Sequence, residues 1–385
     1  MKNKFFIPLM LLVLSLSSCA KVPNEVEFAI DDITINEFHT DLQKNFCLLN
    51  DINDMDDYIN NHYYSDNLGR ESFSSPKGIE VSYKITTDNG ASGSYTVETS
   101  ENANFNDSYE HQATASGATL YNLKINTKYY YKVNAYYKGK MFESEVKEFT
   151  TSSTSIRNIY VDGVENVRDL GGFTLENGKT IKQGLIYRTA QFNYNHSDES
   201  AIKSEPTAKG KEVLLKQLKI KTDIDVREKE TKKGEDETIG INSSPLGSSV
   251  TYLSLPMRFG GSNTITNELN KESLKAFFEY LTVEEHYPIA FHCVRGTDRT
   301  GALAYVLGAL CGMNNNDLMK DYLFSNFANI NGKMTSSNID GTSYYPSQIE
   351  AAEGENMSEK AKNYLMNKVG VSEDTLNQII SILVD

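Results

Sequence analysis

Apolar and polar residues alternate with a period of two through residues 76–153. Apolar side chains stand at every second position in Ile79–Ile85, and a shorter alternating run covers Ser94–Val97. A third and longer run covers Leu123–Tyr137. Such alternation is typical of strands that bury one face, and several of them in sequence favour two packed sheets. The pattern therefore predicts a small all-β sandwich over residues 76–153.

From Ile156 onward, strand-like and helical segments alternate. Leu218–Val226 and Pro288–His292 are short apolar runs that suit buried strands. Three segments carry apolar residues at helical spacing: Lys271–Leu281, Thr300–Met313 and Ala361–Val369. This alternation indicates an α/β fold in which a central sheet is flanked by helices. We expect one α/β domain over residues 156–385.

The first residues of the chain differ from both regions. Lys2 and Lys4 precede an almost wholly apolar run, Phe5–Leu16, which is followed by two serines and Cys19. A short basic segment, an apolar stretch and small residues are typical of a secretory signal peptide, and the run is short for a permanent membrane helix. We therefore expect residues 1–18 to be a signal peptide and the mature protein to be extracytoplasmic.

The segment Leu16-Ser17-Ser18-Cys19 resembles the lipobox of bacterial lipoproteins. The resemblance implies cleavage before Cys19, lipidation of its side chain and acylation of the new amino terminus. Several acyl chains anchor a protein firmly, whereas one chain binds a membrane only marginally. The expected location is therefore lipid-anchored to a bacterial cell membrane. The alternative is an ordinary signal peptide that is cut nearby.

Charge is distributed unevenly along the chain. Its 385 residues include 38 Lys and Arg against 52 Asp and Glu, a formal net charge of −14. Residues 19–75 alone contain 12 acidic and 3 basic residues, with one candidate helix near Ile35–Leu49. We interpret residues 19–75 as an acidic tether that holds the folded domains away from the membrane. The overall acidity argues against nucleic acid as a partner, because nucleic-acid binding needs a positive surface.

One loop carries the candidate chemistry. A predicted strand and a predicted helix are joined by His292-Cys293-Val294-Arg295-Gly296-Thr297-Asp298-Arg299-Thr300-Gly301. In such a setting successive backbone N–H groups point at one anion, and Gly296 permits a tight turn. These groups stabilise a thiolate at Cys293, which makes it a candidate nucleophile. Arg299 offers a planar fork for two phosphate oxygens.

Two more loop residues have predicted roles. Asp298 is the candidate acid that protonates the leaving oxygen, and Thr300 is expected to donate its hydroxyl to the Cys293 thiolate. A Cys and an Arg at this spacing arise easily by chance, but the whole string does not. The structural alternative is an unreactive, buried cysteine at the end of a strand.

The loop resembles the signature loop of cysteine-dependent protein tyrosine phosphatases. More narrowly, it resembles the bacterial tyrosine and dual-specificity group that has Asp before the signature Arg. Other segments resemble motifs of this group in the same order: Asn166–Gly172, Gly184–Thr189, Ile224–Arg227 with Glu230 after it, and Asp321–Asn326. The resemblance covers residues 156–385. It implies that Cys293 attacks phosphorus to form a phosphocysteine, which water then hydrolyses without a metal or other cofactor.

The resemblance also implies which residues serve the substrate. Asp298 carries over as the general acid, with Asp225 as the competing candidate. Arg168, Arg188 and Arg227 are interpreted either as scaffold residues or as direct contacts to the substrate. The predicted substrate-binding residues are Val294, Arg295, Gly296, Thr297, Arg168, Arg188 and Asp225.

The chain departs from the group at the rim of the predicted pocket. The group often has lysine between the loop glycine and aspartate, where this chain has Thr297, with a basic residue at Arg295 instead. Absence of that lysine favours phosphotyrosine as the substrate, with phosphoserine and phosphothreonine as further candidates. A phosphoinositide or inositol phosphate is the alternative, because Arg295 could bind a second phosphate. A third hypothesis is an inactive, anchored adhesion or binding protein.

Within the predicted sandwich, the run from Leu123 to Ala135 resembles the signature strand of fibronectin type III modules. The resemblance implies that Tyr129 bonds back to the backbone at a corner of the sandwich. Ile125 stands where that family usually has proline, and the chain contains no Trp, so the usual core tryptophan is missing. A cell-surface ligand is the candidate partner of the sandwich.

Overall fold

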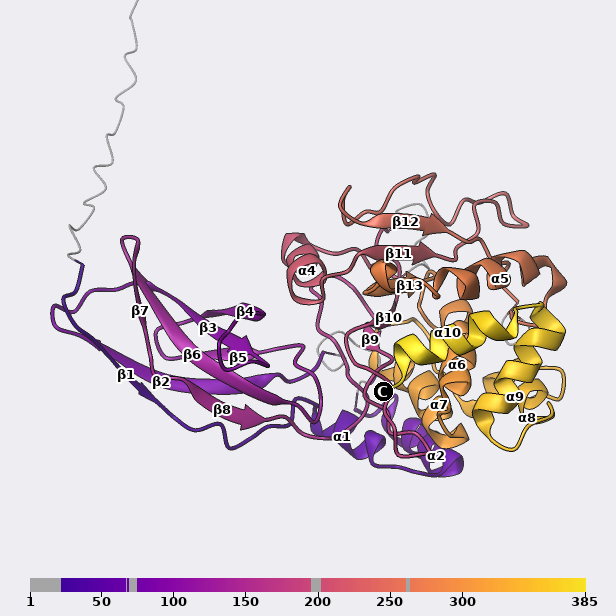
Figure 1. Cartoon of the computed structure of the whole chain (residues 1–385), viewed down its shortest axis with the longest axis horizontal. Helices are drawn as coiled ribbons and strands as arrows, with labels where there is room; N and C mark the ends of the chain where they lie inside the picture. Colours follow the sequence, from indigo (N-terminus) through magenta and orange to yellow (C-terminus); the bar gives the residue numbers. More distant parts are fainter. Residues whose placement is uncertain (1–21, 67, 69–74, 195–201, 261–263) are drawn as a thin grey trace, which may run out of the picture.

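The computed structural model describes residues 22–66, 68, 75–194, 202–260 and 264–385. Two bodies, an all-β sandwich and an α/β unit, lie end to end in this part of the chain (Figure 1). The predicted signal peptide, residues 1–18, and the predicted lipidation site Cys19 lie outside the described residues. In the described ranges, no helix has both the length and the apolar character needed to cross a membrane.

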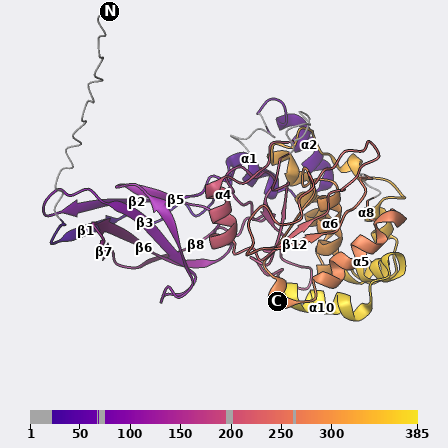
Figure 2. The same cartoon turned by 90° about the horizontal axis from the view of Figure 1, so that it is seen from above.

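The sandwich consists of two antiparallel sheets, ordered β1-β2-β5 and β4-β3-β6-β7, with β8 paired to β6 (Figures 1 and 2). Its strands are β1 (Val26–Ile30), β2 (Ile79–Thr87), β3 (Ser94–Ser100), β4 (Ser108–Ala113), β5 (Gly117–Leu120), β6 (Lys128–Tyr137), β7 (Lys140–Glu143) and β8 (Lys147–Thr150). Alternate residues of β2 are buried from Ile79 to Tyr83, as the pattern predicts. Apolar side chains from both sheets share one core, so the sandwich prediction is confirmed.

Tyr129 makes the predicted bond at a corner of the sandwich. The backbone N–H of Lys124 donates to its hydroxyl oxygen at 2.9 Å, and the ring is buried in the sandwich core. Leu123 and Ile125 are buried in the same core but precede β6, so the alternating run begins in a loop rather than in a strand.

The α/β unit is built on a five-stranded sheet in the order β12-β11-β13-β10-β9. Four strands are parallel, and β9 is antiparallel to β10. These strands are β9 (Arg168–Asp169), β10 (Ile186–Thr189), β11 (Thr222–Asp225), β12 (Thr251–Ser254) and β13 (Ile289–His292). Both faces of β13 are covered, because Ile289 and Phe291 belong to one apolar cluster and Ala290 to another. The α/β prediction is confirmed.

Helices cover both faces of this sheet. One face carries α4 (Ala208–Glu212) and the π-helical turn Val213–Gln217, whose Leu214 packs in the same cluster as Ala290. The other helices lie on the opposite side of the sheet (Figure 1). Their apolar side chains join one cluster there. The helices on this side are α1 (Asp41–Cys47), α2 (Ile52–His62), α5 (Lys271–Tyr280), α6 (Arg299–Cys311), α7 (Asn315–Leu323), α8 (Tyr345–Glu350), α9 (Met357–Tyr364) and α10 (Glu373–Leu383).

The prediction that residues 19–75 form an acidic tether is wrong for the described part of this segment, which is folded. Its first strand, β1, pairs with β2 and completes a sheet of the sandwich. The helices α1 and α2 then cross to the α/β unit, where Phe46, Met55 and Ile59 are fully buried. Two acidic residues of α2, Asp54 and Asp57, are exposed, so the net charge of the segment conceals a narrow apolar stripe. The segment is part of both folded bodies.

Side-chain hydrogen bonds join the sandwich to the α/β unit. Arg157 donates to the carbonyl oxygen of Asn122 at 2.6 Å and to that of Leu123 at 3.1 Å. The Gln183 amide accepts from the backbone N–H of Ile125 at 2.9 Å and donates to its carbonyl oxygen at 3.0 Å. Since buried polar groups need such partners, these bonds favour one fixed arrangement of the two bodies.

Candidate active site

The loop after β13 is positioned by the strand before it and the helix after it. β13 ends at His292 and α6 begins at Arg299, so residues 293–298 form the connection. β13 lies between β11 and β10 in the middle of the sheet, and all of its residues are buried. The free N–H groups at the start of α6 therefore face the same space as the loop, and favour an anion there.

Gly296 is required at the turn of this loop. Its φ is +73°, and a Cβ there would stand 2.5 Å from the carbonyl oxygen of Thr189. The same turn is held by Arg188, whose guanidinium donates to the carbonyl oxygen of Gly296 at 2.6 Å. The side chain of Asn166 donates to the carbonyl oxygen of Arg295 at 3.1 Å. The loop carbonyls are thus bonded from behind, which leaves the loop N–H groups on the other side.

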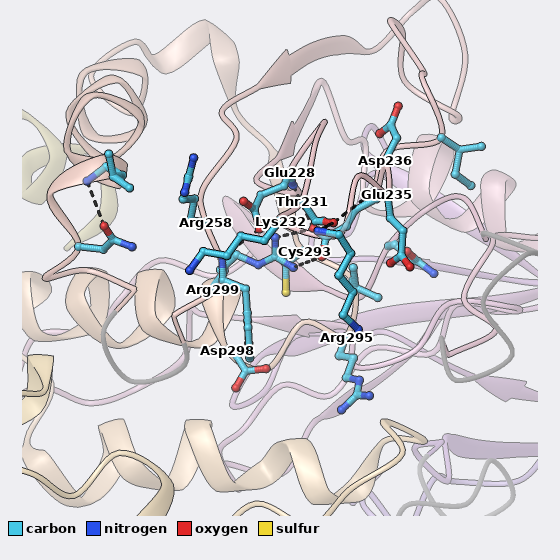
Figure 3. A pocket seen from close by; sticks show the side chains of 18 of the residues that line it. Glu228, Thr231, Lys232, Glu235, Asp236, Arg258, Cys293, Arg295, Asp298 and Arg299 are labelled. Carbon is cyan, nitrogen blue, oxygen red and sulfur yellow. Dashed lines mark hydrogen bonds and ion pairs between the residues drawn. The ribbon is translucent and has the colours of Figure 1, made fainter.

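Cys293 lines a pocket of about 1130 Å³ and is only 2 % exposed, so it lies at the inner end (Figure 3). The walls are formed by the loop itself, Gln191, residues 228–240, residues 258–259 and residues 267–269. The charged lining residues are Glu228, Lys232, Lys233, Glu235, Asp236, Glu237, Arg258, Arg295, Asp298 and Arg299. Acidic and basic groups therefore face each other across a site in an acidic protein.

Arg299 interacts electrostatically with Cys293 and forms an ion pair with Glu237. Its NH1 donates to Glu237 Oε2 at 2.6 Å, and its NH2 donates to Oε1 at 3.3 Å. Its Nε is buried and has no hydrogen-bond partner among the described residues. Burial lowers the pKa of Arg299, but the Cys293 thiolate and the Glu237 carboxylate raise it, so that it lies above its usual value. A buried donor without a partner beside a cysteine loop suits an oxyanion.

Asp298, the predicted general acid, and Thr300, the predicted donor to the Cys293 thiolate, differ in their placement. Asp298 lines the pocket, and its Oδ2 accepts from the hydroxyl of Thr297 at 3.0 Å. Thr300 is fully buried, and its hydroxyl has no hydrogen-bond partner among the described residues. The predicted hydrogen bond from Thr300 to Cys293 is therefore not formed in this structure.

The predicted substrate-binding residues of the loop divide into two groups. Val294 and Arg295 line the pocket, as predicted. Gly296 is buried at the turn of the loop and does not line the pocket, and Thr297 is 1 % exposed with its hydroxyl bonded to Asp298. The prediction that the Thr297 side chain rims the pocket is wrong, because this hydroxyl is turned inward.

Arg168 and Arg188 are scaffold residues. Arg168 Nε donates to Asp321 Oδ1 at 3.0 Å, and Arg188 NH1 donates to Oδ2 of the same carboxylate. Both arginines are at most 1 % exposed, and neither lines the Cys293 pocket. Burial raises the pKa of Asp321, but Arg188 and Arg168 outweigh this effect and lower it overall. The predicted direct contact of these two arginines with substrate is wrong.

Asp225 is also a support. Its carboxylate accepts from the Arg227 guanidinium at 2.6 Å and from the Tyr252 hydroxyl at 2.9 Å. It is fully buried and does not line the pocket. Burial raises the pKa of Asp225, but His292 and Arg227 lower it to about 2. An ionised carboxylate with these partners is neither the competing general acid nor a substrate contact, which corrects both predictions.

Residues 228–240 are the part of the site that the sequence did not predict. Glu237, which holds Arg299, belongs to this segment. Glu230, which the resemblance singled out, does not line the pocket. The only signal in the sequence was the density of charge there, and charged runs are ordinary on solvated loops.

Comparison with known proteins places this site in a family. The sequence model of the Tyrosine phosphatase family matches residues 159–385. A curated protein of Cupriavidus necator, named as a tyrosine-protein phosphatase, is 27 % identical over 183 residues. That match covers 44 % of this chain and 63 % of the relative, so the chain spans less than two thirds of the relative's length.

Two solved structures are also similar. The catalytic domain of the PP-IP phosphatase SIW14 from S. cerevisiae is 14 % identical, with a TM-score of 0.30, and covers 55 % of this chain and 94 % of that chain. A cysteine-to-serine variant of P. aeruginosa TpbA in complex with pTyr is 16 % identical, with a TM-score of 0.27, over 53 % of this chain and 89 % of that chain. At such TM-scores neither likeness adds to the family assignment.

Proposed function

The chain belongs to the tyrosine phosphatase family, and from this premise we propose that it hydrolyses phosphotyrosine esters through a phosphocysteine on Cys293. The observation that carries the proposal is the partnerless, buried Nε of Arg299 beside the cysteine loop. A bound phosphoryl group supplies the acceptor that this donor lacks, and the loop N–H groups supply further bonds.

The proposed reaction has two steps. Cys293 Sγ attacks phosphorus, so that the S–P bond forms while the bond to the tyrosyl oxygen breaks. Asp298 protonates that oxygen as it leaves. Water then attacks phosphorus, Asp298 accepts its proton, and the thiolate leaves with release of inorganic phosphate. Arg299 and the loop N–H groups stabilise the charge on the equatorial oxygens in both transition states.

Apolar residues at the pocket support an aryl substrate. Ile239, Phe259 and Leu269 line the pocket and are 44 %, 59 % and 66 % exposed. Exposed apolar side chains around a polar floor suit a substrate that joins a ring to a phosphate. Phosphoserine and phosphothreonine lack the ring and are expected to react more slowly at this site.

An inositol phosphate or phosphoinositide is the second candidate substrate, and a different observation favours it. Besides Arg299, four cations line the pocket: Lys232, Lys233, Arg258 and Arg295. Among the described residues, none of their side chains has an ion pair or hydrogen bond. Unpaired cations around one phosphate site could hold further phosphates of the same molecule.

A substrate panel tests the proposal. We expect the full-length protein to hydrolyse p-nitrophenyl phosphate and phosphotyrosine peptides in the presence of a metal chelator, and Cys293→Ser to lose this activity. A strong preference for inositol phosphates would select the second candidate. Turnover by Cys293→Ser at the wild-type rate would contradict both. Tight phosphopeptide binding without any turnover by the wild type would support the inactive binding protein.

We also propose that the enzyme is lipid-anchored outside the cytoplasm through Cys19, and that the sandwich is a fibronectin type III-like module for a cell-surface ligand. The lipobox resemblance supports the anchor. The bond from Lys124 to Tyr129 supports the module. Fatty-acid labelling of the wild type, lost in Cys19→Ala, would support the anchor. Equal labelling of both proteins would contradict it.

A further inference from the structure

A buried histidine lies where the sandwich meets the α/β unit. His39 stands between Phe38, which belongs to the sandwich core, and helix α1, which packs on the α/β unit (Figures 1 and 2). Two segments, residues 36–39 and 150–156, connect the two bodies here, and we call them the junction. Asn36 bonds the second segment through its side chain at 2.8 Å and through its carbonyl oxygen at 3.0 Å. The His39 side chain is 0 % exposed within this junction.

Both nitrogens of the His39 ring face oxygen atoms. Nδ1 lies 2.7 Å from Glu37 Oε1, and Nε2 lies 2.6 Å from the carbonyl oxygen of Ile156. That carbonyl oxygen also accepts from the backbone N–H of Asn158 at 2.9 Å. A carbonyl oxygen has no proton to donate, so Nε2 must carry the proton of this bond.

The partner of Nδ1 is an ionised carboxylate. Glu37 Oε1 also accepts from the backbone N–H of His39 at 3.0 Å, and Oε2 accepts from the hydroxyls of Ser152 at 2.9 Å and Thr154 at 2.6 Å. Burial raises the pKa of Glu37, but the bonds from His39 and Thr154 outweigh it and lower the pKa to about 2. An ionised carboxylate only accepts hydrogen bonds, so Nδ1 must carry a proton as well. The ring is therefore a buried imidazolium.

Two other titratable groups lie beside this cluster. The backbone N–H of Ile156 donates to the sulfur of Cys47 on α1. Burial raises the pKa of Cys47 to about 12, although this bond and Lys320 oppose the effect, so the thiol is neutral at ordinary pH. Lys320 on α7 is paired with Asp317 at 3.3 Å. Neither group supplies a charge that could replace the second ring proton of His39.

We propose that His39 fixes the junction as a doubly protonated ring, and that the junction opens locally when the ring loses one proton. Loss of either proton would turn a nitrogen lone pair toward an oxygen lone pair and leave the Glu37 carboxylate buried without its counter-charge. The closed junction holds a proton that the open one releases, so its stability falls as the pH rises. This device is independent of the proposed phosphatase function.

Thiol labelling of the full-length protein tests the opening. Cys47 reports on the junction because its sulfur is bonded to Ile156. Cys311 is the internal reference, because it is equally buried and burial also raises its pKa to about 12. We expect the rate of Cys47 labelling, divided by that of Cys311, to rise at least about tenfold between about pH 6 and about pH 9. Mass spectrometry of the peptides assigns the two sites, and the ratio removes the effect of pH on thiol reactivity itself.

Nuclear magnetic resonance of protein that carries ¹⁵N-histidine reads the ring directly. At about pH 6 we expect both ring nitrogens of His39 to give the shifts of protonated nitrogens. The signals are assigned by their loss in His39→Gln. One unprotonated ring nitrogen in the folded protein at this pH would overturn the proposal.

Glu37→Gln tests the cause of the pH dependence. Its neutral amide has no charge for the ring to balance, so loss of a ring proton costs less, and we expect the labelling ratio to change under about threefold over the same pH range. His62→Gln is the matched control. It removes a histidine that pairs with the Asp66 carboxylate, but the two side chains are 34 % and 40 % exposed. This variant should keep the change of the wild type.

Two labelling results would overturn the proposal. The first is a wild-type ratio that stays within about twofold between the two pH values, since the junction would then not open. The second is an equal rise in Glu37→Gln and the wild type, since another group would then drive the opening. If Glu37→Gln fails to fold, the wild-type ratio and the ring signals still decide.

Discussion

Two carboxylates hold arginines on opposite sides of the phosphate loop, and they are built differently. Asp321 lies on helix α7, its side chain is 6 % exposed, and it accepts from both Arg168 and Arg188. Glu237 lies in a loop, its side chain is 22 % exposed, and it holds only Arg299. The first pair of arginines faces away from the pocket, whereas Arg299 lines it. The buried carboxylate therefore supports the loop, and the more exposed one orients the group that meets substrate.

The first way to test this comparison is to remove Asp321. Asp321→Ala leaves two buried guanidiniums without their shared partner, and we expect a loss of about 4 kcal/mol in the free energy of unfolding. Glu237→Gln is expected to cost only about 1 kcal/mol, because its amide oxygen can still accept from Arg299 and from the backbone N–H of Glu228. Urea denaturation of both variants measures the difference. Equal losses would mean that the two carboxylates do not have separate roles.

The loss of stability at low pH is a second test of the buried carboxylates that support the loop. Arg188 and Arg168 lower the pKa of Asp321, and His292 and Arg227 lower that of Asp225 to about 2 from its ordinary 3.8, against burial that raises both. A lowered pKa in the folded state adds stability that is present above the unfolded pKa and is lost as the pH falls. We therefore expect the wild type to lose stability between about pH 4 and pH 2. Asp321→Asn should lose less over this window.

The next prediction concerns the packing behind Asp321. Phe46 of α1 is fully buried, and its ring lies 6.2 Å from Phe324 and 5.4 Å from Phe327, just after α7. Phe46→Ala should cost about 3 kcal/mol through the cavity that it leaves. Leu48→Ala, at a side chain that is 60 % exposed, is the control and should cost under about 0.5 kcal/mol. A small loss at Phe46 would restore the interpretation of this segment as a spacer.

The same contrast explains what the sequence could predict. The strand Pro288–His292 and the helix after it were predicted because their apolar patterns are dense and the loop between them contains a long motif. The loop roles of Cys293, Arg295 and Arg299 agree with their placement in one pocket. Local pattern was sufficient there, because strand, loop and helix are adjacent in the chain.

Contacts between distant segments could not be predicted in this way. The ion pair of Arg168 with Asp321 spans 153 positions, and nothing local separates a buried scaffold arginine from one that binds substrate. Net charge also misled, since α2 is acidic yet buries Met55 and Ile59. Glu237 stands in a charged run with no periodicity, so only the fold reveals that it reaches Arg299.

The smallest expected effect is that of removing the Phe259 ring, which lines the pocket and does not support the loop. The ring of Phe259 lies with its centroid 5.9 Å from the guanidinium carbon of Arg299, and the side chain is 59 % exposed. An exposed ring at the pocket can also contact the ring of a bound substrate. Loss of one such aromatic contact is worth about 0.5–1 kcal/mol, so Phe259→Ala should raise KM for a phosphotyrosine peptide about threefold. Because the ring is exposed, the free energy of unfolding should not change, and kcat should stay near the wild-type value.

A matched variant and a second substrate make the Phe259 result specific. Val283→Ala, at an exposed apolar residue away from the pocket, should leave KM unaltered. An alkyl phosphate has no ring to contact Phe259, so its KM should be the same in Phe259→Ala and the wild type. If kcat falls while KM is constant, Phe259 acts on the direction of Arg299 rather than on the substrate. Glu237 and Phe259 would then not have separate roles, because both would orient the guanidinium of Arg299.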